Sequence, residues 1–146
     1  MALGTVIAIT MAIMRQSINP VLRGVASAYI WFFRGTPIYT QLIFWSLLPT
    51  LFQTISLGIP GTEFGFSFET REWFTQFWMA FIGLGLNEGA YLAEIIRAGL
   101  LSVDKGQWEA ATALGMPRGK IFRRIILPQA LRVIVPPIGN ETISML

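Results

Sequence analysis

The stretch Ile38–Ile59, IYTQLIFWSLLPTLFQTISLGI, decides the class of fold. It lies within 28 uncharged residues between Arg34 and Glu63. A helix of ~20 residues crosses a bilayer, so this stretch is long enough to cross with some tilt. We expect Arg34 at the lipid headgroups and Pro37 at the opening of the helix. Pro49 lies inside the span, where a membrane helix tolerates it, so the sequence also predicts a kink near Pro49.

The composition of the whole chain agrees with a membrane protein. Of the 146 residues, 53% are apolar and 13% are charged, whereas soluble domains have about 25% charged residues. A lone soluble globule would have too few charges to cover its surface, and a disordered chain would be less hydrophobic. The chain has no cysteine and no histidine, which excludes disulfide frameworks, thiolate and imidazole metal sites and histidine triads. We therefore expect no catalytic residue, cofactor or metal site.

Other apolar segments flank this span. Residues 1–14 carry no charge and predict the tail of a crossing helix whose beginning is missing. A cleaved signal peptide is the less favoured interpretation, because the apolar run opens the chain without a basic start. Residues 73–101 begin with clustered aromatic rings, as at a membrane boundary, and residues 129–146 turn apolar again. We expect an all-α, polytopic transmembrane helical bundle in a single domain over residues 1–146, incomplete at both ends.

The basic residues indicate how the chain is oriented. If the chain crosses alternately, ten of its eleven Lys and Arg residues fall on one side. The loop on the other side, about residues 60–72, has Arg71 against Glu63, Glu69 and Glu72. Lys and Arg are retained on the cytoplasmic side. The sequence therefore places the loop over residues 104–128 in the cytoplasm.

That loop carries the most informative pattern, GQWEAATALG, which ends at Gly115. Ser102 or Asp104 can cap the start of a helix, and the alanines favour its continuation. Gly115 suits the left-handed residue that ends a helix. Pro117 suits the first turn of a second helix, and Pro128 marks its exit. The pattern predicts two short helices joined by a bend.

The second of these helices is basic and amphipathic, with Arg118, Lys120, Arg123 and Arg124 beside apolar residues. On its own it indicates a helix that lies on anionic lipid headgroups. The small residues of the first helix indicate a close-fitting surface that the groove of another protein could receive. Plain helix-forming alanine is the simpler interpretation of the same residues.

The loop resembles the EAA loop of the membrane subunits of binding-protein-dependent ABC importers. Further stretches are similar to the polar amino-acid permease subfamily: RGTP at 34–37, AYLAEIIR at 90–97, LPQALR at 127–132 and the prolines at 136 and 137. The resemblance covers nearly the whole chain. It implies the fold of an ABC type I importer permease, of which this chain is a fragment.

In that family the EAA loop forms coupling helices that dock into a cleft on a cytoplasmic ATPase. The resemblance therefore implies a set of ATPase-coupling residues in this chain, which are Gly106, Gln107, Glu109, Ala110, Ala111, Gly115, Ile125, Leu127 and Pro128. Lys and Arg of the second helix are expected to pair with acidic residues of the ATPase.

The resemblance also implies partners and a location. The partners are a cytoplasmic ABC ATPase dimer, a second permease subunit of the same or a sister kind, an extracytoplasmic solute-binding protein and the lipid bilayer, with no nucleic acid. The location is the plasma membrane of a prokaryote. ATP and Mg²⁺ would be bound by the ATPase. The nearest match to a phosphate-binding loop in this chain, GMPRGK, has three residues between its glycines instead of four, and Ile121 follows where Ser or Thr is needed.

Polar residues within the third apolar segment are the candidates for the substrate pathway. A charged group inside a span is costly and usually faces a pathway or a partner. We expect Asn87, Glu88, Tyr91 and Glu94 to line the translocation route, with Glu88 and Tyr91 on one helical face. Glu88 would suit an ammonium group, or a partner elsewhere could satisfy it. For Glu94 and Arg97, three residues apart, a structural ion pair is the favoured interpretation.

Three alternatives stay open. The same machinery could move another small solute, such as an opine or a peptide-like compound. A non-transporting membrane scaffold or a channel-like pore would share the hydropathy and would need no docking loop. A soluble or interface-bound helical protein would bury its apolar runs in an unusual core.

Overall fold

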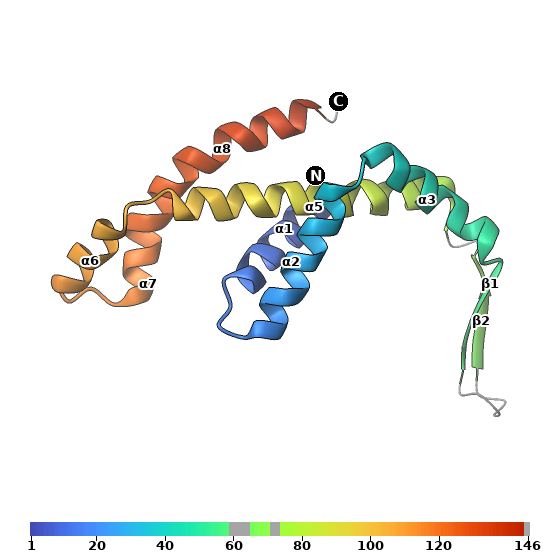
Figure 1. Cartoon of the computed structure of the whole chain (residues 1–146), viewed down its shortest axis with the longest axis horizontal. Coiled ribbons are helices and arrows are strands. Elements are labelled where there is room, and N and C mark those ends of the chain that lie inside the picture. The colour runs from blue at the N-terminus through green and yellow to red at the C-terminus, as the bar shows by residue number, and fades with distance from the viewer. Residues whose placement is uncertain (59–64, 71–73, 145–146) are drawn as a thin grey trace.

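The structure is a computed structural model that describes residues 1–58, 65–70 and 74–144 (Figure 1). Of the expected outer loop, Glu63, Arg71 and Glu72 lie outside the described residues. In chain order the elements are α1 (Ala2–Arg15), α2 (Pro20–Gly35), α3 (Ile38–Leu51), β1 (Thr54–Gly58), β2 (Gly65–Glu69), α5 (Gln76–Leu101), α6 (Lys105–Ala113), α7 (Arg118–Ile121), the π-helical turn η1 (Phe122–Ile126) and α8 (Leu127–Ser144).

The long helix α5 is the axis of the fold. It runs across Figure 1 with α6 and α7 at one end and the β1–β2 hairpin at the other, and α1, α2, α3 and α8 all contact it. Thr75 caps its start by accepting a hydrogen bond from the backbone N–H of Trp78. Among the described residues, α5 is the one helix long and apolar enough to cross a membrane. Of the predicted segment 73–101, residues 76–101 thus form a long apolar helix, as predicted.

The prediction of one helix over Ile38–Ile59 is wrong. The helix α3 ends at Leu51, two residues after Pro49, and the chain then forms β1, which pairs antiparallel with β2. The register places Thr54 opposite Glu69 and Gly58 opposite Gly65. In TISLG, polar or small residues alternate with apolar ones, and this alternation is typical of a strand. The prediction of a helix considered only that the stretch has no charged residues, which does not distinguish a strand from a helix. The described fold is therefore helical except for one two-stranded hairpin.

Small residues let α1 and α5 approach closely. Gly4, Ala8 and Ala12 recur every four residues on α1 and are buried, and Gly85 and Gly89 do the same on α5. A Cβ on Gly85 would lie 2.6 Å from Leu3 Cδ2, and one on Gly89 would lie 2.7 Å from Ile7 Cγ2. Helices in membranes associate through such small residues because lipid supplies no hydrophobic drive between them.

Outside these contacts, the surface of the bundle is strongly apolar. Ala8, Ile30, Leu92 and Ala93 form a small buried cluster where α1, α2 and α5 meet. Many large apolar side chains point outward instead, such as Trp31 with 77% of its surface exposed. Exposed apolar area of this extent marks surfaces that a bilayer or a partner covers.

Candidate functional site: a docking loop and a charged cavity

The first helix of the loop, α6, has the start and the end that the sequence predicts. The Asp104 side chain caps it by accepting a hydrogen bond from Gly106 N at 2.6 Å. At the other end Gly115 adopts a φ of +73°. Gly115 N donates to Thr112 O at 2.9 Å, and Met116 N donates to Ala111 O at 3.1 Å. These paired bonds are a Schellman motif, which satisfies the last carbonyls of a helix and turns the chain sharply.

Replacing Gly115 with alanine is expected to loosen this turn by about 1–2 kcal/mol, the cost of a left-handed conformation for a residue with a Cβ. No atom lies within 4 Å of the added methyl group, so the backbone alone is responsible. Hydrogen exchange of the Gly115 and Met116 amides in the full-length protein measures the effect. Gly119→Ala is the matched control, because Gly119 also has open space around it and lies in the helix α7. Equal exchange in the two variants would contradict the explanation.

The second helix begins as predicted but does not end where predicted. Pro117 is the residue before α7. Pro128, however, lies inside a helical segment that continues from Arg118 to Ser144. In η1 the backbone widens, and Leu127 N bonds to Phe122 O, five residues earlier. The missing N–H of Pro128 falls just where the helix returns to the α pattern, so the proline is accommodated.

The predicted coupling residues divide into an inner and an outer set. Ala111 is 2% exposed and packs on Ile121 and Ile126, with Trp108 and Met116 closing the cluster. Ala111 is therefore small because the second helix of the loop needs the space. Ile125 and Leu127 are half-buried, and the outward set is Gly106, Gln107, Glu109, Ala110, Gly115 and Pro128.

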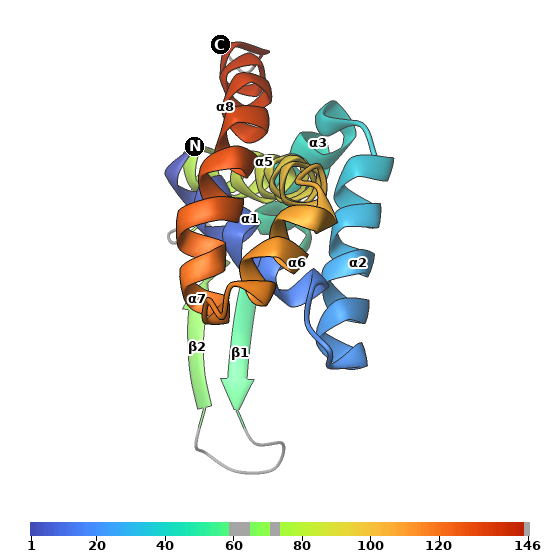
Figure 2. The same cartoon turned by 90° about the vertical axis from the view of Figure 1, so that its left-hand side faces the viewer.

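The loop is braced against α8 and α5 and presents one compact end. Gln129 Nε2 donates to Gln107 Oε1 at 3.3 Å, which links the start of α8 to α6. Leu100, from the end of α5, and Val103 pack against the buried cluster of the loop. Figure 2, which looks toward this end, shows α6 and α7 side by side in front of α5.

One residue on the exposed face of the loop was not predicted from the sequence. Leu114, beside Gly115 at the tip of the bend, is 81% exposed. Leu114 is not among the side chains that pack on the buried cluster of the loop. Its sequence signal is its place directly before Gly115, the residue that ends the helix.

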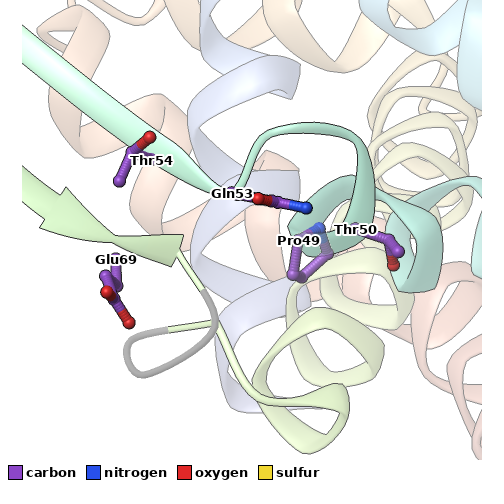
Figure 3. A pocket seen from close by; sticks show the side chains of 5 residues that line it. All are labelled: Pro49, Thr50, Gln53, Thr54 and Glu69. Atoms are coloured by element: carbon purple, nitrogen blue, oxygen red, sulfur yellow. The ribbon is translucent and has the colours of Figure 1, made fainter.

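At the other end of the fold, a cavity of about 300 Å³ lies where α3 meets the hairpin. Its lining includes none of the predicted site residues (Figure 3). It is lined by Pro49, Thr50, Gln53, Thr54 and Glu69.

The four candidates for the substrate pathway do not share one cavity. Asn87 and Tyr91 line a cavity of about 480 Å³. Glu88 borders a separate cavity of about 450 Å³ and is 1% exposed, and neither of its carboxylate oxygens has a hydrogen-bond partner in the described part of the chain. Glu88 and Tyr91 therefore border different cavities, although they lie three positions apart on one helical face.

Glu94 has the structural role that the sequence favours. Arg97 Nη2 lies 2.5 Å from Glu94 Oε1, which confirms the expected ion pair within α5. Arg15 Nη1 lies 2.7 Å from Glu94 Oε2 and adds a link from α1 that the sequence does not reveal. One carboxylate thus holds two guanidinium groups. Glu94 also borders a third cavity, of about 380 Å³, next to Tyr91.

A buried amide network holds Asn87 in place. Asn87 Nδ2 donates to Phe33 O at 3.2 Å and to Gln41 Oε1 at 3.3 Å. Gln41 in turn donates to Phe33 O at 3.0 Å and to Thr36 Oγ1 at 2.6 Å. The turn between α2 and α3 is thereby fixed against α5. Pro37 opens α3 as predicted.

Arg34 lies at the junction of two cavities. Its guanidinium carbon is 5.3 Å from the centre of the Tyr91 ring, a cation–π contact between α2 and α5. Arg34, Gly35 and Tyr91 line both the 480 Å³ and the 380 Å³ cavity. The residue that the sequence indicates as a boundary marker is therefore a lining residue of the same cavity as Asn87.

Taken together, a helical bundle with an apolar surface, a long apolar central helix and a braced two-helix loop are the features of a membrane-embedded subunit. Residues 4–146 match the family described as "Binding-protein-dependent transport system inner membrane component". The chain belongs to this family.

Individual relatives agree with this assignment. The chain is 53% identical over 146 residues to the arginine transport system permease protein ArgU of Corynebacterium glutamicum, covering 100% of this chain and 45% of that protein. It is 43% identical to the octopine transport system permease protein OccM of Rhizobium radiobacter, covering 99% of this chain and 55% of that one. The chain spans about half the length of these curated relatives.

A solved structure shares the fold. The crystal structure of an amino acid ABC transporter with histidines contains a chain that superposes with a TM-score of 0.74 at 36% identity. The match covers 99% of this chain and 59% of that one. The fold of an ABC importer permease, expected from the resemblance, is thereby confirmed over the described residues.

Proposed function

We propose that this chain is part of the transmembrane subunit of an ATP-driven ABC importer that moves polar amino acids into the cell. The observation that carries the proposal is the loop over residues 104–128. This two-helix element packs around its own buried cluster and has an exposed face at one end of α5. A scaffold or a simple pore would not need such an element.

In this proposal the outward face of the loop docks on a cytoplasmic ATPase. Gly106, Ala110 and Gly115 offer little side-chain bulk, so a partner backbone can approach closely, and the exposed Glu109 can pair across the interface. Leu114 at the tip supplies apolar area to bury. Because Ala111 locks α6 onto Ile121 and Ile126, the loop moves as one body and passes the displacement on to α8 and α5.

The remaining partners follow from this role. A second permease subunit, of the same or a sister kind, pairs with this one across the membrane, and a dimer of ATPases binds the two loops in the cytoplasm. ATP and Mg²⁺ bind to the ATPases, whose two arrangements bias the membrane subunits between inward- and outward-open forms. An extracytoplasmic solute-binding protein delivers the solute.

The solute class is supported by the relatives and by the cavity. One relative is named for arginine and another for octopine. The cavity that Asn87 and Tyr91 line also has the charged residues Arg34 and Glu141 at its wall, and it has the volume of a small-molecule site. Asn87 and Tyr91 are therefore the residues for which we propose direct contact with the solute, while Glu94 holds the bundle through Arg15 and Arg97.

Reconstitution tests the proposal. The full-length protein, co-expressed with the ATPase and binding protein of its own system, is placed in liposomes and supplied with labelled L-arginine or L-glutamine. We expect uptake that requires both ATP inside and the binding protein outside. Uptake that persists without ATP would indicate a pore, and stable assembly with no uptake of either amino acid would indicate a scaffold or another solute.

A further inference from the structure

A cavity of about 260 Å³ lies where α3, the end of the hairpin and the start of α5 meet. It is separate from the cavities that the predicted pathway residues line, and it lies toward the end of α5 opposite the two-helix loop (Figure 1). Its walls include Leu48 of α3, Phe52 directly after that helix, and Met79 and Ile82 of α5. Among the described residues no charged side chain lines it, so the cavity suits an apolar occupant.

Two residues that line this cavity carry a buried polar atom with no hydrogen-bond partner in the described part of the chain. The atoms are the indole nitrogen Nε1 of Trp45, on α3, and the hydroxyl oxygen Oγ1 of Thr70, which directly follows β2. Over residues 1–58, 65–70 and 74–144, the other buried side-chain atoms in this condition are the two carboxylate oxygens of Glu88. A buried polar group without a partner costs free energy. Two of them at one cavity therefore indicate an occupant that bonds to them.

Both residues are held in place by contacts that leave these atoms unused. The Trp45 ring packs against Gly83 of α5, where an added Cβ would lie 2.6 Å from Trp45 Cδ1. The backbone N–H of Thr70 donates to Gln53 O at 2.9 Å, and the Thr70 carbonyl accepts from Phe74 N at 2.8 Å. Thr70 is 3% exposed. The indole N–H and the hydroxyl therefore remain for a molecule in the cavity.

These two groups define the chemistry of the occupant. An indole N–H can only donate, so the occupant must carry an acceptor, to which the threonine hydroxyl can also donate. The rest of the molecule must be apolar to match the walls of the cavity. A single water molecule fits poorly, because a buried water typically makes about three hydrogen bonds and the cavity offers two unpaired side-chain groups.

The surface around the cavity indicates the bilayer as the source of this molecule. Phe52 lines the cavity and is 56% exposed, so the cavity reaches the surface of the bundle. Phe77 and Trp78, at the start of α5, are also exposed. Aromatic side chains gather at the depth of the membrane–water interface, where the ester groups of phospholipids lie. A phospholipid has both required parts, since its acyl chain is apolar and its ester carbonyl is an acceptor.

We propose that this cavity binds one acyl chain of a membrane phospholipid, and that the ester carbonyl of that chain accepts hydrogen bonds from Trp45 Nε1 and Thr70 Oγ1. The inference goes beyond the proposed function, since it requires only that the bundle lies in a membrane. The bound lipid links α3 to the end of the hairpin, because Trp45 and Thr70 belong to these two elements. Recognition depends on the ester group, and the headgroup stays outside the cavity.

Lipid titration followed by native mass spectrometry tests the assignment. The full-length permease with its ATPase is delipidated in detergent and titrated with dioleoyl phosphatidylcholine or with its ether-linked analogue, which has the same headgroup and chain lengths but no ester carbonyl. A zwitterionic headgroup is used because anionic lipids would also bind the basic residues of the two-helix loop. The variants are Trp45→Phe and Thr70→Val, which remove the N–H and the hydroxyl and keep similar shapes. Trp31→Phe is the control, since Trp31 is an exposed tryptophan of α2 that does not line this cavity.

We expect the wild type to bind the ester lipid at least about fivefold more tightly than the ether analogue. Trp45→Phe and Thr70→Val should each weaken binding of the ester lipid by about fivefold and leave binding of the ether analogue within about twofold. Trp31→Phe should keep the wild-type preference. Equal affinity of the wild type for the two lipids, or wild-type affinity for the ester lipid in both variants, overturns the assignment.

Melting temperatures distinguish a lipid partner from a partner inside the protein. Without lipid, Thr70→Val should unfold at the wild-type temperature or above it, because the hydroxyl that it removes is buried without a partner there. With the ester lipid present, the melting temperature should rise more in the wild type than in the variant. A melting temperature of Thr70→Val that is lower than that of the wild type by the same amount with and without lipid would show that the hydroxyl bonds within the protein or to a buried water, and it would overturn the assignment.

Discussion

The Gly89→Val variant is expected to yield no folded subunit. A Cβ at this position would lie 2.7 Å from Ile7 Cγ2 and 2.9 Å from Tyr29 Oη, so that α1 and α2 both obstruct it. Gly89 is packed at the contact where α5 meets both helices, and the Tyr29 hydroxyl there donates to the carbonyl oxygen of Leu86. Overpacking of a tight interior costs about 1–3 kcal/mol and more where backbone must move. The measurement is the yield of monodisperse full-length protein extracted from membranes.

Gly24→Val is the matched control for this prediction. Gly24 lies within α2, and no atom lies within 4 Å of an added Cβ. At this position, replacing glycine with valine stabilises the helix by a few tenths of a kcal/mol, because valine has the higher helix propensity. We expect wild-type yield from Gly24→Val and a loss of at least about tenfold from Gly89→Val. Similar yields from both variants would show that the α1–α5 approach is not essential to the bundle.

The Leu114→Ser variant is expected to lose its ATPase. Leu114 is 81% exposed in the chain alone, and full burial of a leucine contributes about 1.5–3 kcal/mol. If the ATPase cleft covers this side chain, removing it weakens the complex by about 10- to 150-fold. The measurement is the amount of ATPase that co-purifies with the tagged full-length permease, together with the rate of ATP-dependent uptake in liposomes.

Ile18→Ser is the control for the docking prediction. Ile18 is 99% exposed and lies between α1 and α2, outside the loop. The Ile18→Ser substitution removes a similar exposed apolar side chain from outside the loop, so ATPase recovery and uptake should stay at wild-type levels. Because neither side chain packs inside the subunit, both variants should fold. ATPase recovery that is unchanged in Leu114→Ser, or equally reduced in both variants, would contradict docking through the tip of the bend.

Local signals in the loop were sufficient to predict its shape. Asp104 as a cap and Gly115 as a left-handed residue depend on a few neighbouring atoms, and the structure has both. Pro128 was misleading, because a proline marks the end of a helix only when the preceding turn cannot adjust. The π-helical turn η1 provides that adjustment.

The hydropathy of the sequence correctly indicated a membrane protein, but it led to a wrong prediction of one long helix over Ile38–Ile59. Absence of charge over Ile38–Ile59 does not distinguish a helix from a strand, and the chain leaves the helix at Leu51. Conversely, α5 carries Glu88, Glu94 and Arg97 and is nevertheless the long apolar helix. Its charged groups are tolerated because neighbouring helices cover or pair most of them.

By itself, the sequence determined the helical membrane class, the two-helix loop and the ion pair between Glu94 and Arg97. Each of these depends on residues close together in the chain, whose spacing local geometry converts directly into contact. Only the tertiary structure decided that Arg15 joins Glu94, that Ala111 faces inward and that Arg34 shares a cavity with Glu141. The first and the last of these relations join residues 79 and 107 positions apart, and the second joins two helices of the loop. They follow from the distances at which α1, α2 and α8 pack on α5, which the small residues permit but no local pattern specifies.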